Sequence, residues 1–153
     1  MNTLLRRVES LDEALAMAPA IDAYAAQAMA EFIDGPLPEG VSRRFFNRHF
    51  TASESALLVA ESAHGKADLG VCITGPFEDP LIGLRVPMVL LLFVSPDVRH
   101  RGLARAMVEA VTQVLESRGH AKLAARAAHN DDALISMGER WGFVRQWEMM
   151  LRE

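Results

Sequence analysis

Apolar residues recur at helical spacing in the first fifty residues of the chain. Residues 3–9 predict a short strand, and Ser10 with Glu13 forms a capping box that opens a helix. We expect Pro19 to break or restart this helix, because proline cannot donate the backbone hydrogen bond of a helix interior. A stripe of apolar residues then continues to a segment rich in proline and glycine, and residues 41–50 predict a second helix. The stripe consists of Ile21, Tyr24, Ala25, Ala28, Met29, Phe32 and Ile33.

The middle of the chain has the pattern of strands. Residues 56–61 and 69–75 are apolar runs joined by a polar segment that contains glycine, which favours an antiparallel hairpin. Residues 76–87 hold three prolines and a glycine, so we expect a loop or a distorted hairpin arm there. The unbroken apolar run 88–94 predicts a strand buried on both faces, at the centre of a sheet with helices on either side.

Helical and strand patterns alternate in the last third of the chain. Residues 103–118 carry one apolar stripe opposite charged and polar residues, and Gly119 is a natural end for that helix. Residues 122–127 predict a strand, residues 131–141 a helix, and residues 143–151 a closing strand. This order of elements predicts a mixed α/β architecture.

Length and composition limit what the protein can do. The chain has 153 residues, half of them hydrophobic, so we expect one domain, residues 1–153, with a sizeable core. With a net charge of −4 and a sequence pI near 5.7, no global positive field attracts nucleic acid or an anionic membrane. The single cysteine, Cys72, excludes an internal disulfide and a cysteine-rich zinc site, and it fits a reduced cytoplasmic location. We expect neither a signal peptide nor a membrane span.

A basic turn separates the apolar run from the helix that follows it. The sequence VRHRGLARAM, residues 98–107, places Arg99, His100 and Arg101 directly before Gly102. The free N–H groups and partial positive charge of a helix N-terminus favour a phosphate, and glycine lets the backbone approach it closely. The arginines add positive charge where the helix dipole alone would disfavour it, which indicates a bound anion. A solvated basic turn is the alternative that these residues leave open.

The segment FVSPDVRHRGLA, residues 93–104, resembles the acyl-coenzyme-A-binding signature of the GNAT superfamily of N-acyltransferases. The chain contains neither a Walker A phosphate loop nor a strand-linked G-x-G-x-x-G motif. The resemblance implies an α/β GNAT-like fold, in which a mixed central sheet has a splayed central strand and helices on both faces. The matching positions are Val94, Pro96, Arg99, Gly102, Ala104, Asn130, Ala133, Gly142 and Phe143.

The resemblance also implies a binding site for acetyl-coenzyme A (acetyl-CoA). The strand before the turn would pair its free backbone groups with the pantetheine arm, and the amides of the turn would hold the pyrophosphate. Asn130 stands where the family often has a side chain that touches the arm, and capping of a helix that begins at residue 131 is its alternative role. The implied cofactor-binding residues are Leu92, Phe93, Val94, Arg99, His100, Arg101, Gly102, Leu103, Ala104 and Asn130.

The implied reaction is transfer of an acetyl group to a primary amine by direct attack in a ternary complex. Such a reaction needs no serine or cysteine nucleophile, because positioning supplies much of the rate, whereas the ammonium must first lose a proton. Where many members of the family have a tyrosine that protonates the leaving thiolate, this chain has Gly138. Glu61 is the nearest candidate for the base and Ser136 for the acid. An exposed strand-end carboxylate and a polar helix residue are their alternative roles.

Several functional questions stay open in the sequence. The acceptor is a small-molecule amine or a peptide amine, and we expect residues 76–87 and the helices around 32–50 to shape its site. The histidines lack metal-ligand spacing, so we expect no metal. The alternatives to an enzyme are a catalytically silent acyl-CoA-binding regulatory module, which the missing tyrosine and carboxylates favour, and an interaction protein that uses the fold as a scaffold. A homodimer is also left open.

Overall fold

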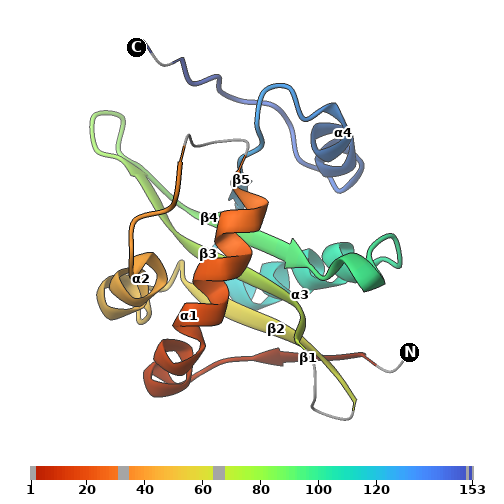
Figure 1. The fold of residues 1–153 in the computed structure, drawn as a ribbon. Coiled ribbons are helices and arrows are strands. Elements are labelled where there is room, and N and C mark those ends of the chain that lie inside the picture. Colours follow the sequence, from red (N-terminus) through yellow and green to blue (C-terminus); the bar gives the residue numbers. More distant parts are fainter. Residues whose placement is uncertain (1–2, 31–34, 64–67, 151, 153) are drawn as a thin grey trace.

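The computed structural model describes residues 3–30, 35–63, 68–150 and 152 (Figure 1). Their centre is a five-stranded sheet with the strand order β1-β2-β3-β4-β5. The first four strands pair antiparallel with their neighbours in sequence, and β5 is parallel to β4, so the sheet is mixed. The strands are β1 (Thr3–Arg7), β2 (Ala56–Ser62), β3 (Asp68–Asp79), β4 (Leu84–Val94) and β5 (Ala124–Ala125).

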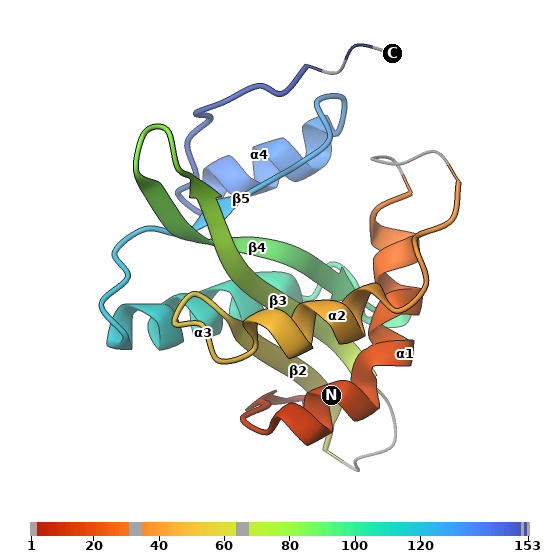
Figure 2. The ribbon, with the colours of Figure 1, turned by 90° about the vertical axis from the view of Figure 1, so that its left-hand side faces the viewer.

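Helices cover both faces of this sheet, which confirms the predicted fold class. Figures 1 and 2 show α1 and α2 on one face, α3 on the other, and α4 beyond β5. A short 3-10 helix, η1, follows β4 directly and precedes α3. The helices are α1 (Leu11–Ala28), α2 (Val41–His49), η1 (Pro96–Val98), α3 (Leu103–Ser117) and α4 (Asp132–Arg140).

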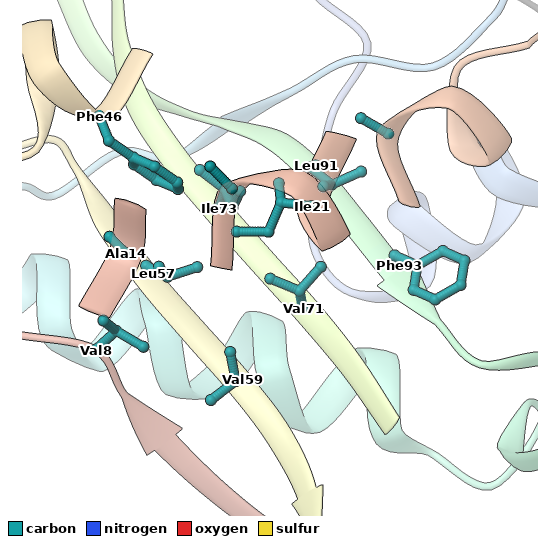
Figure 3. Close-up of a cluster of buried hydrophobic side chains, with 12 residues drawn as sticks. Val8, Ala14, Ile21, Phe46, Leu57, Val59, Val71, Ile73, Leu91 and Phe93 are labelled. Atoms are coloured by element: carbon teal, nitrogen blue, oxygen red, sulfur yellow. The ribbon is translucent and has the colours of Figure 1, made fainter. Parts of the chain in front are cut away.

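Two apolar clusters fill the space between the sheet and the helices. Figure 3 shows the cluster under α1 and α2, where Phe46 lies against Ile73. On the other face, Met107 and Val111 of α3 pack in a cluster with Cys72 of β3. Strand β4 contributes residues to both clusters, and every second position along most of the strand is only partly buried, so the predicted burial on both faces is confirmed in part. Burial of each large apolar side chain stabilises the fold by about 1.5–3 kcal/mol.

One of the two hydrogen bonds of the predicted capping box is present at the start of α1. Ser10 is the N-cap, and its Oγ accepts a hydrogen bond from the N–H of Glu13 at 3.4 Å. The Glu13 carboxylate does not complete the box, because it forms an ion pair with Arg6 at 2.5 Å.

Pro19 does not interrupt α1, so the predicted break is wrong. The helix runs without interruption from Leu11 to Ala28, and Pro19 lies on its exposed side. Ala18 and Ile21 are buried against the sheet on either side of the proline, and this burial offsets the cost of a lost backbone hydrogen bond. The predicted stripe positions Phe32 and Ile33 lie outside the described residues.

The proline-rich segment 76–87 forms a hairpin arm, which decides between the two alternatives left by the sequence. Strand β3 continues to Asp79 and β4 begins at Leu84, and Pro76 lies opposite Pro87 in the ladder. At the tip, the Asp79 carboxylate accepts a hydrogen bond from the N–H of Leu81 at 3.1 Å. The hairpin therefore projects past the ends of the neighbouring strands (Figure 2).

The two last predicted strands are short or absent. Only Ala124–Ala125 of the predicted strand 122–127 pairs with β4, and the described residues 143–150 form no strand, so the closing strand is wrong. A strand of two residues offers too short an edge for another strand to pair along it. The segment is held instead by a ring contact between Trp147 and Phe77, with ring centroids 5.4 Å apart. Its exposed apolar residues are Val144, Trp147, Met149 and Met150.

Within the described ranges, no helix is long and apolar enough to cross a membrane.

Candidate active site

Strands β4 and β5 separate after a short parallel contact. They pair only at Met88 with Ala124 and at Val89 with Ala125, so the edge of β4 from Leu90 onward extends beyond β5. On its other edge β4 remains paired with β3 as far as Val94. The central strand is therefore splayed from its parallel neighbour, as the fold class implies.

A β-bulge lies where the two strands separate. In the register with β3, Ile73 pairs with Leu91 and Thr74 pairs with Val89, so Leu90 is an extra residue. Leu90 lies on the face covered by α2, because its Cδ1 is 2.8 Å from the point where a Cβ on Gly75 would stand. Sequence analysis missed this bulge, although a glycine inside a strand is a signal for a bulge or a close approach.

The turn after β4 ends at an N-terminus of α3 that no side chain caps. Gly102 is the N-cap residue, with φ +80°, a left-handed conformation that glycine adopts without strain. His100 also has a positive φ of 63°. Apart from Gly102 and its neighbours in the chain, no described residue has a heavy atom within 4 Å of the position that a Cβ on Gly102 would take. The first N–H groups of α3 thus lie next to open space.

The charges around this turn favour an anion. Arg99 donates a hydrogen bond from Nε to the carbonyl oxygen of Val94 at 2.9 Å, which fixes it over the end of β4. Among the described side chains, no carboxylate forms an ion pair with Arg99, His100 or Arg101. A cavity of about 440 Å³ borders the turn. Its lining residues are Thr3, Leu5, Val98, Arg101, Gly102, Leu103 and Ala106.

The structure does not bring the two candidate catalytic residues to the β4 edge. Glu61 lies on β2, with β3 between it and β4, and its Oε1 accepts hydrogen bonds from Arg6 at 3.0 and 2.7 Å. Ser136 is exposed on α4. A Cβ on Gly138, the position of the family tyrosine, would meet only the Cβ of Phe143, at 3.9 Å, among the described atoms. Both catalytic roles stay predictions, and the ion pair of Glu61 argues against its use as a base.

Asn130 does not cap α4. The N-cap is Asp131, whose Oδ1 accepts a hydrogen bond from the N–H of Leu134 at 3.0 Å, so the capping alternative is wrong. Asp131 and not Asn130 is the N-cap, because α4 begins one residue later than the sequence pattern indicates. Asn130 is exposed in the turn before the cap, and its contact with a cofactor stays a prediction.

The end of α1 covers the opening between β4 and β5. The ring of Tyr24 stacks on Phe93 of β4, with centroids 4.5 Å apart and planes 11° apart. Arg126, directly after β5, donates a hydrogen bond to Sδ of Met29 at 3.7 Å, and burial lowers the pKa of its guanidinium. These contacts join α1, β4 and β5 around the splay. No local sequence signal indicates them, because the residues are far apart along the chain.

A second cavity, of about 420 Å³, lies under α2 at the end of the sheet where β2 begins. Nearby, the hydroxyl of Thr74 donates to the carbonyl oxygen of Glu54 at 2.8 Å and accepts from the N–H of Ala56 at 3.0 Å. The Glu54 carboxylate is buried, and the hydrogen bond from Arg85 lowers its pKa. This polar network fixes the loop that closes one side of the cavity, and sequence analysis did not identify it.

We predict that Cys72 is inert in the folded protein. The residue is fully buried in the sheet, and burial raises the pKa of its thiol to about 12, so almost no thiolate exists at neutral pH. Ellman's reagent should therefore label no thiol in the native protein and one thiol in guanidinium chloride. Rapid labelling under native conditions would show that the strand around Cys72 opens.

Three comparisons with known proteins address this geometry. The model of the FR47-like protein family matches residues 79–151, which include β4, the turn, α3 and α4. The chain is 27% identical over 107 residues to the mouse protein named probable N-acetyltransferase family 8 member 5. That match covers 69% of this chain and 43% of the mouse protein, so the chain spans less than half the length of this relative.

Solved acetyltransferase structures share the fold. One is the ribosomal-protein-alanine N-acetyltransferase of Brucella melitensis biovar Abortus 2308, with a TM-score of 0.65, 20% identity and 99% of each chain covered. Another is AAC(6')-Iy in complex with the bisubstrate analogue CoA-S-monomethyl-acetylneamine, with a TM-score of 0.74, 13% identity, and 100% of this chain and 98% of that chain covered. Residues 79–151 are thus similar to the FR47-like family, and the chain has the fold of these acetyltransferases, which agrees with the splayed β4 and its turn.

Proposed function

We propose that the protein is an acetyl-CoA-dependent N-acetyltransferase that acts on a primary amine in a ternary complex. One observation carries the proposal: the edge of β4 beyond β5 leads directly to the uncapped N-terminus of α3 at Gly102. This geometry offers backbone groups to an extended arm and N–H groups to a phosphate at the end of that arm. The similarity to a mouse N-acetyltransferase supports the same activity.

The residues of the turn fit the cofactor. The open space at Gly102 accommodates the pyrophosphate, and Arg99 and Arg101 supply positive charge beside it. In this proposal the backbone of Leu92, Phe93 and Val94 pairs with the pantetheine arm. The amides of residues 99–104, which are Arg99, His100, Arg101, Gly102, Leu103 and Ala104, hold the pyrophosphate, and Asn130 contacts the arm. Bound acetyl-CoA supplies the acetyl group as a thioester.

The protein holds the amine next to the thioester so that attack is direct. The amine nitrogen forms a bond to the carbonyl carbon, the carbon–sulfur bond breaks, the sulfur leaves as a thiolate, and the nitrogen loses its proton. A backbone N–H on the free edge of β4 stabilises the intermediate oxyanion. The sequences of β4 and β5, LRVPMVLLLFV and AA, contain no Asp or Glu, so a water molecule takes the proton in this proposal.

The alternative of a catalytically silent acyl-CoA-binding module is not favoured, because the relative and the structural neighbours are acetyltransferases. We propose a small-molecule or peptide amine as the acceptor. A cytoplasmic location is supported by the buried, unpaired thiol of Cys72.

The test of this function is thiol release from acetyl-CoA in the presence of a panel of primary amines. We expect acetyl-CoA to bind and raise the melting temperature, and kcat/KM to rise with pH as the alkylammonium, with a pKa of about 10, loses its proton. No falling limb from a tyrosine acid should appear, because Gly138 occupies that position. Failure of millimolar acetyl-CoA to bind a folded sample would contradict the proposal.

The same assay tests whether an acid is needed. Ser136→Ala should lower kcat by less than about tenfold, because a thiolate with a pKa of about 8.5 leaves readily without protonation. A far larger loss with unchanged cofactor affinity would assign the proton to Ser136.

A further inference from the structure

We infer that the cavity under α2 binds the apolar body of the amine acceptor, so that the acceptors are monoamines with an aromatic or aliphatic body rather than polycations. The inference rests on the proposed acetyltransferase function. The cavity has a volume of about 420 Å³, which lies within the usual range of small-molecule sites, about 300–1,000 Å³.

One side of this cavity is aromatic and aliphatic. Phe45, Phe46 and Phe50 line it from the α2 side, and Leu57 and Ile73 line it from the sheet. Figure 3 shows Phe46 directed from α2 toward Ile73. The rings pack edge-to-face, with centroids 5.7 Å apart for Phe45 and Phe46 and 6.2 Å apart for Phe46 and Phe50. Such a surface binds a phenyl ring or an alkyl chain by removing it from water.

The polar groups of the cavity do not suit a polycation. Among the described lining residues, the one carboxylate, on Glu9, forms an ion pair with Arg7, and the other charged group is the guanidinium of Arg118. Arg118 donates hydrogen bonds to the carbonyl oxygens of Ser53 at 3.1 Å and Ser55 at 2.6 Å. A ligand with several ammonium groups would therefore meet arginines and no free carboxylate in this part of the described structure.

One buried hydroxyl in the lining has no partner among the described residues. Ser55 is 6% exposed, and its Oγ makes no hydrogen bond to any of them. The hydroxyl of Thr74, which also lines the cavity, is already occupied by its bonds to the backbone. An unpaired buried hydroxyl is costly, so a ligand with one polar atom near Ser55 would regain that hydrogen bond.

The side chain of Phe45 lines the cavity and also lies close to the β4 bulge. Two ring atoms of Phe45 lie 2.7 and 2.8 Å from the point where a Cβ on Gly75 would stand, and Cδ1 of Leu90 lies 2.8 Å from the same point. Phe45 thus contacts the region of the bulge while it lines the cavity. Pairing with β5 ends beside Leu90, where the free edge of β4 that stabilises the oxyanion in the proposed function begins. An acceptor with its body in the cavity can therefore direct its amine toward the splay.

The decisive experiment compares amines that have the same head group and different bodies. We expect kcat/KM for 2-phenylethylamine to exceed that for ethylamine by about tenfold or more, and kanamycin, a polycation, to be the poorer substrate. Ala52→Phe places a ring into the cavity from the loop before β2 and should lower kcat/KM for 2-phenylethylamine by about tenfold. The matched control, Ala16→Phe on the exposed side of α1, should leave every value unchanged.

Direct binding keeps the test independent of turnover. Saturation-transfer NMR should detect 2-phenylethylamine on the wild-type protein and on Ala16→Phe, and lose it on Ala52→Phe. Ala52→Leu gives the same comparison with a smaller side chain if the phenylalanine variant does not fold. Equal kcat/KM for ethylamine and 2-phenylethylamine, or a preference for kanamycin, would overturn the inference while the proposed function stands. If acetyl-CoA does not bind and no amine is acetylated, the proposed function fails and the inference fails with it.

Discussion

We expect Gly102→Glu to abolish detectable acetyl-CoA binding, while the variant stays folded. The substitution places a carboxylate in the open space at the N-terminus of α3, where the proposed pyrophosphate lies. The carboxylate occupies the same N–H groups and repels the phosphates, so the dissociation constant should rise by a factor of roughly 100 or more, or about 2.7 kcal/mol. Isothermal titration calorimetry measures this change, and circular dichroism verifies the fold.

The chain contains a matched control for the backbone effect. Gly119 lies just beyond the other end of α3, with φ +88° and no described atom within 4 Å of the point where a Cβ would stand. Gly119→Glu therefore introduces the same side chain with the same left-handed strain, about 1–2 kcal/mol, far from the turn. Both variants should lose similar stability, and only Gly102→Glu should lose the cofactor. Equal affinity in the two variants would mean that the phosphate binds elsewhere.

Met107→Ala should lower the free energy of unfolding by about 2–5 kcal/mol. Met107 is fully buried in the second turn of α3, and its Cε lies 2.9 Å from the point where a Cβ on Gly70 of β3 would stand. Truncation leaves a cavity between α3 and the sheet that the rigid strands cannot fill. For a chain of this length, we expect the melting temperature to fall by roughly 5–20 °C in a thermal scan.

Met107→Leu distinguishes the stability cost of removed side-chain volume from the cost of a changed side-chain shape. Leucine fills nearly the same volume, so this variant should cost less than about 1.5 kcal/mol. Arg105→Ala, on the exposed side of the same helix, tests the removal of a surface pair with Glu109 and should change the melting temperature little. If Met107→Ala melted at the wild-type temperature, α3 would not depend on this contact with the sheet.

Local sequence patterns predicted the elements whose signals lie within one segment. The β2–β3 hairpin, α2 and α3 follow from periodicity and turn residues, and Gly119 ends α3 with φ +88° as expected. The turn at Gly102 was also predictable from one segment, because its basic residues, its glycine and the start of the helix are contiguous in the sequence. The family resemblance rests on this turn, and the fold class that it implies is the one that the structure has.

Features that depend on distant residues were not predictable in this way. Pro19 has the local signature of a helix breaker, yet burial of Ala18 and Ile21 against the sheet keeps α1 intact. The predicted closing strand, residues 143–151, has a composition typical of strands, but β5 is too short to offer it an edge for pairing. The cavity under α2 combines residues from β1, α2, β2, β3 and the end of α3, and no spacing along the chain indicates it.

The narrow contact between β4 and β5 also has a consequence for how the chain folds. The strands β1 to β4 pair with sequence neighbours, with β1 joined to β2 through two helices, whereas β5 returns to β4 only after the crossover through α3. We expect β5 and α4 to join the fold last, because contacts that close a crossover form late. We also expect their amide hydrogens to exchange first, because β5 is held by a ladder of only two residue pairs. A ligand that bridges the two strands would bind the closed form and slow that exchange.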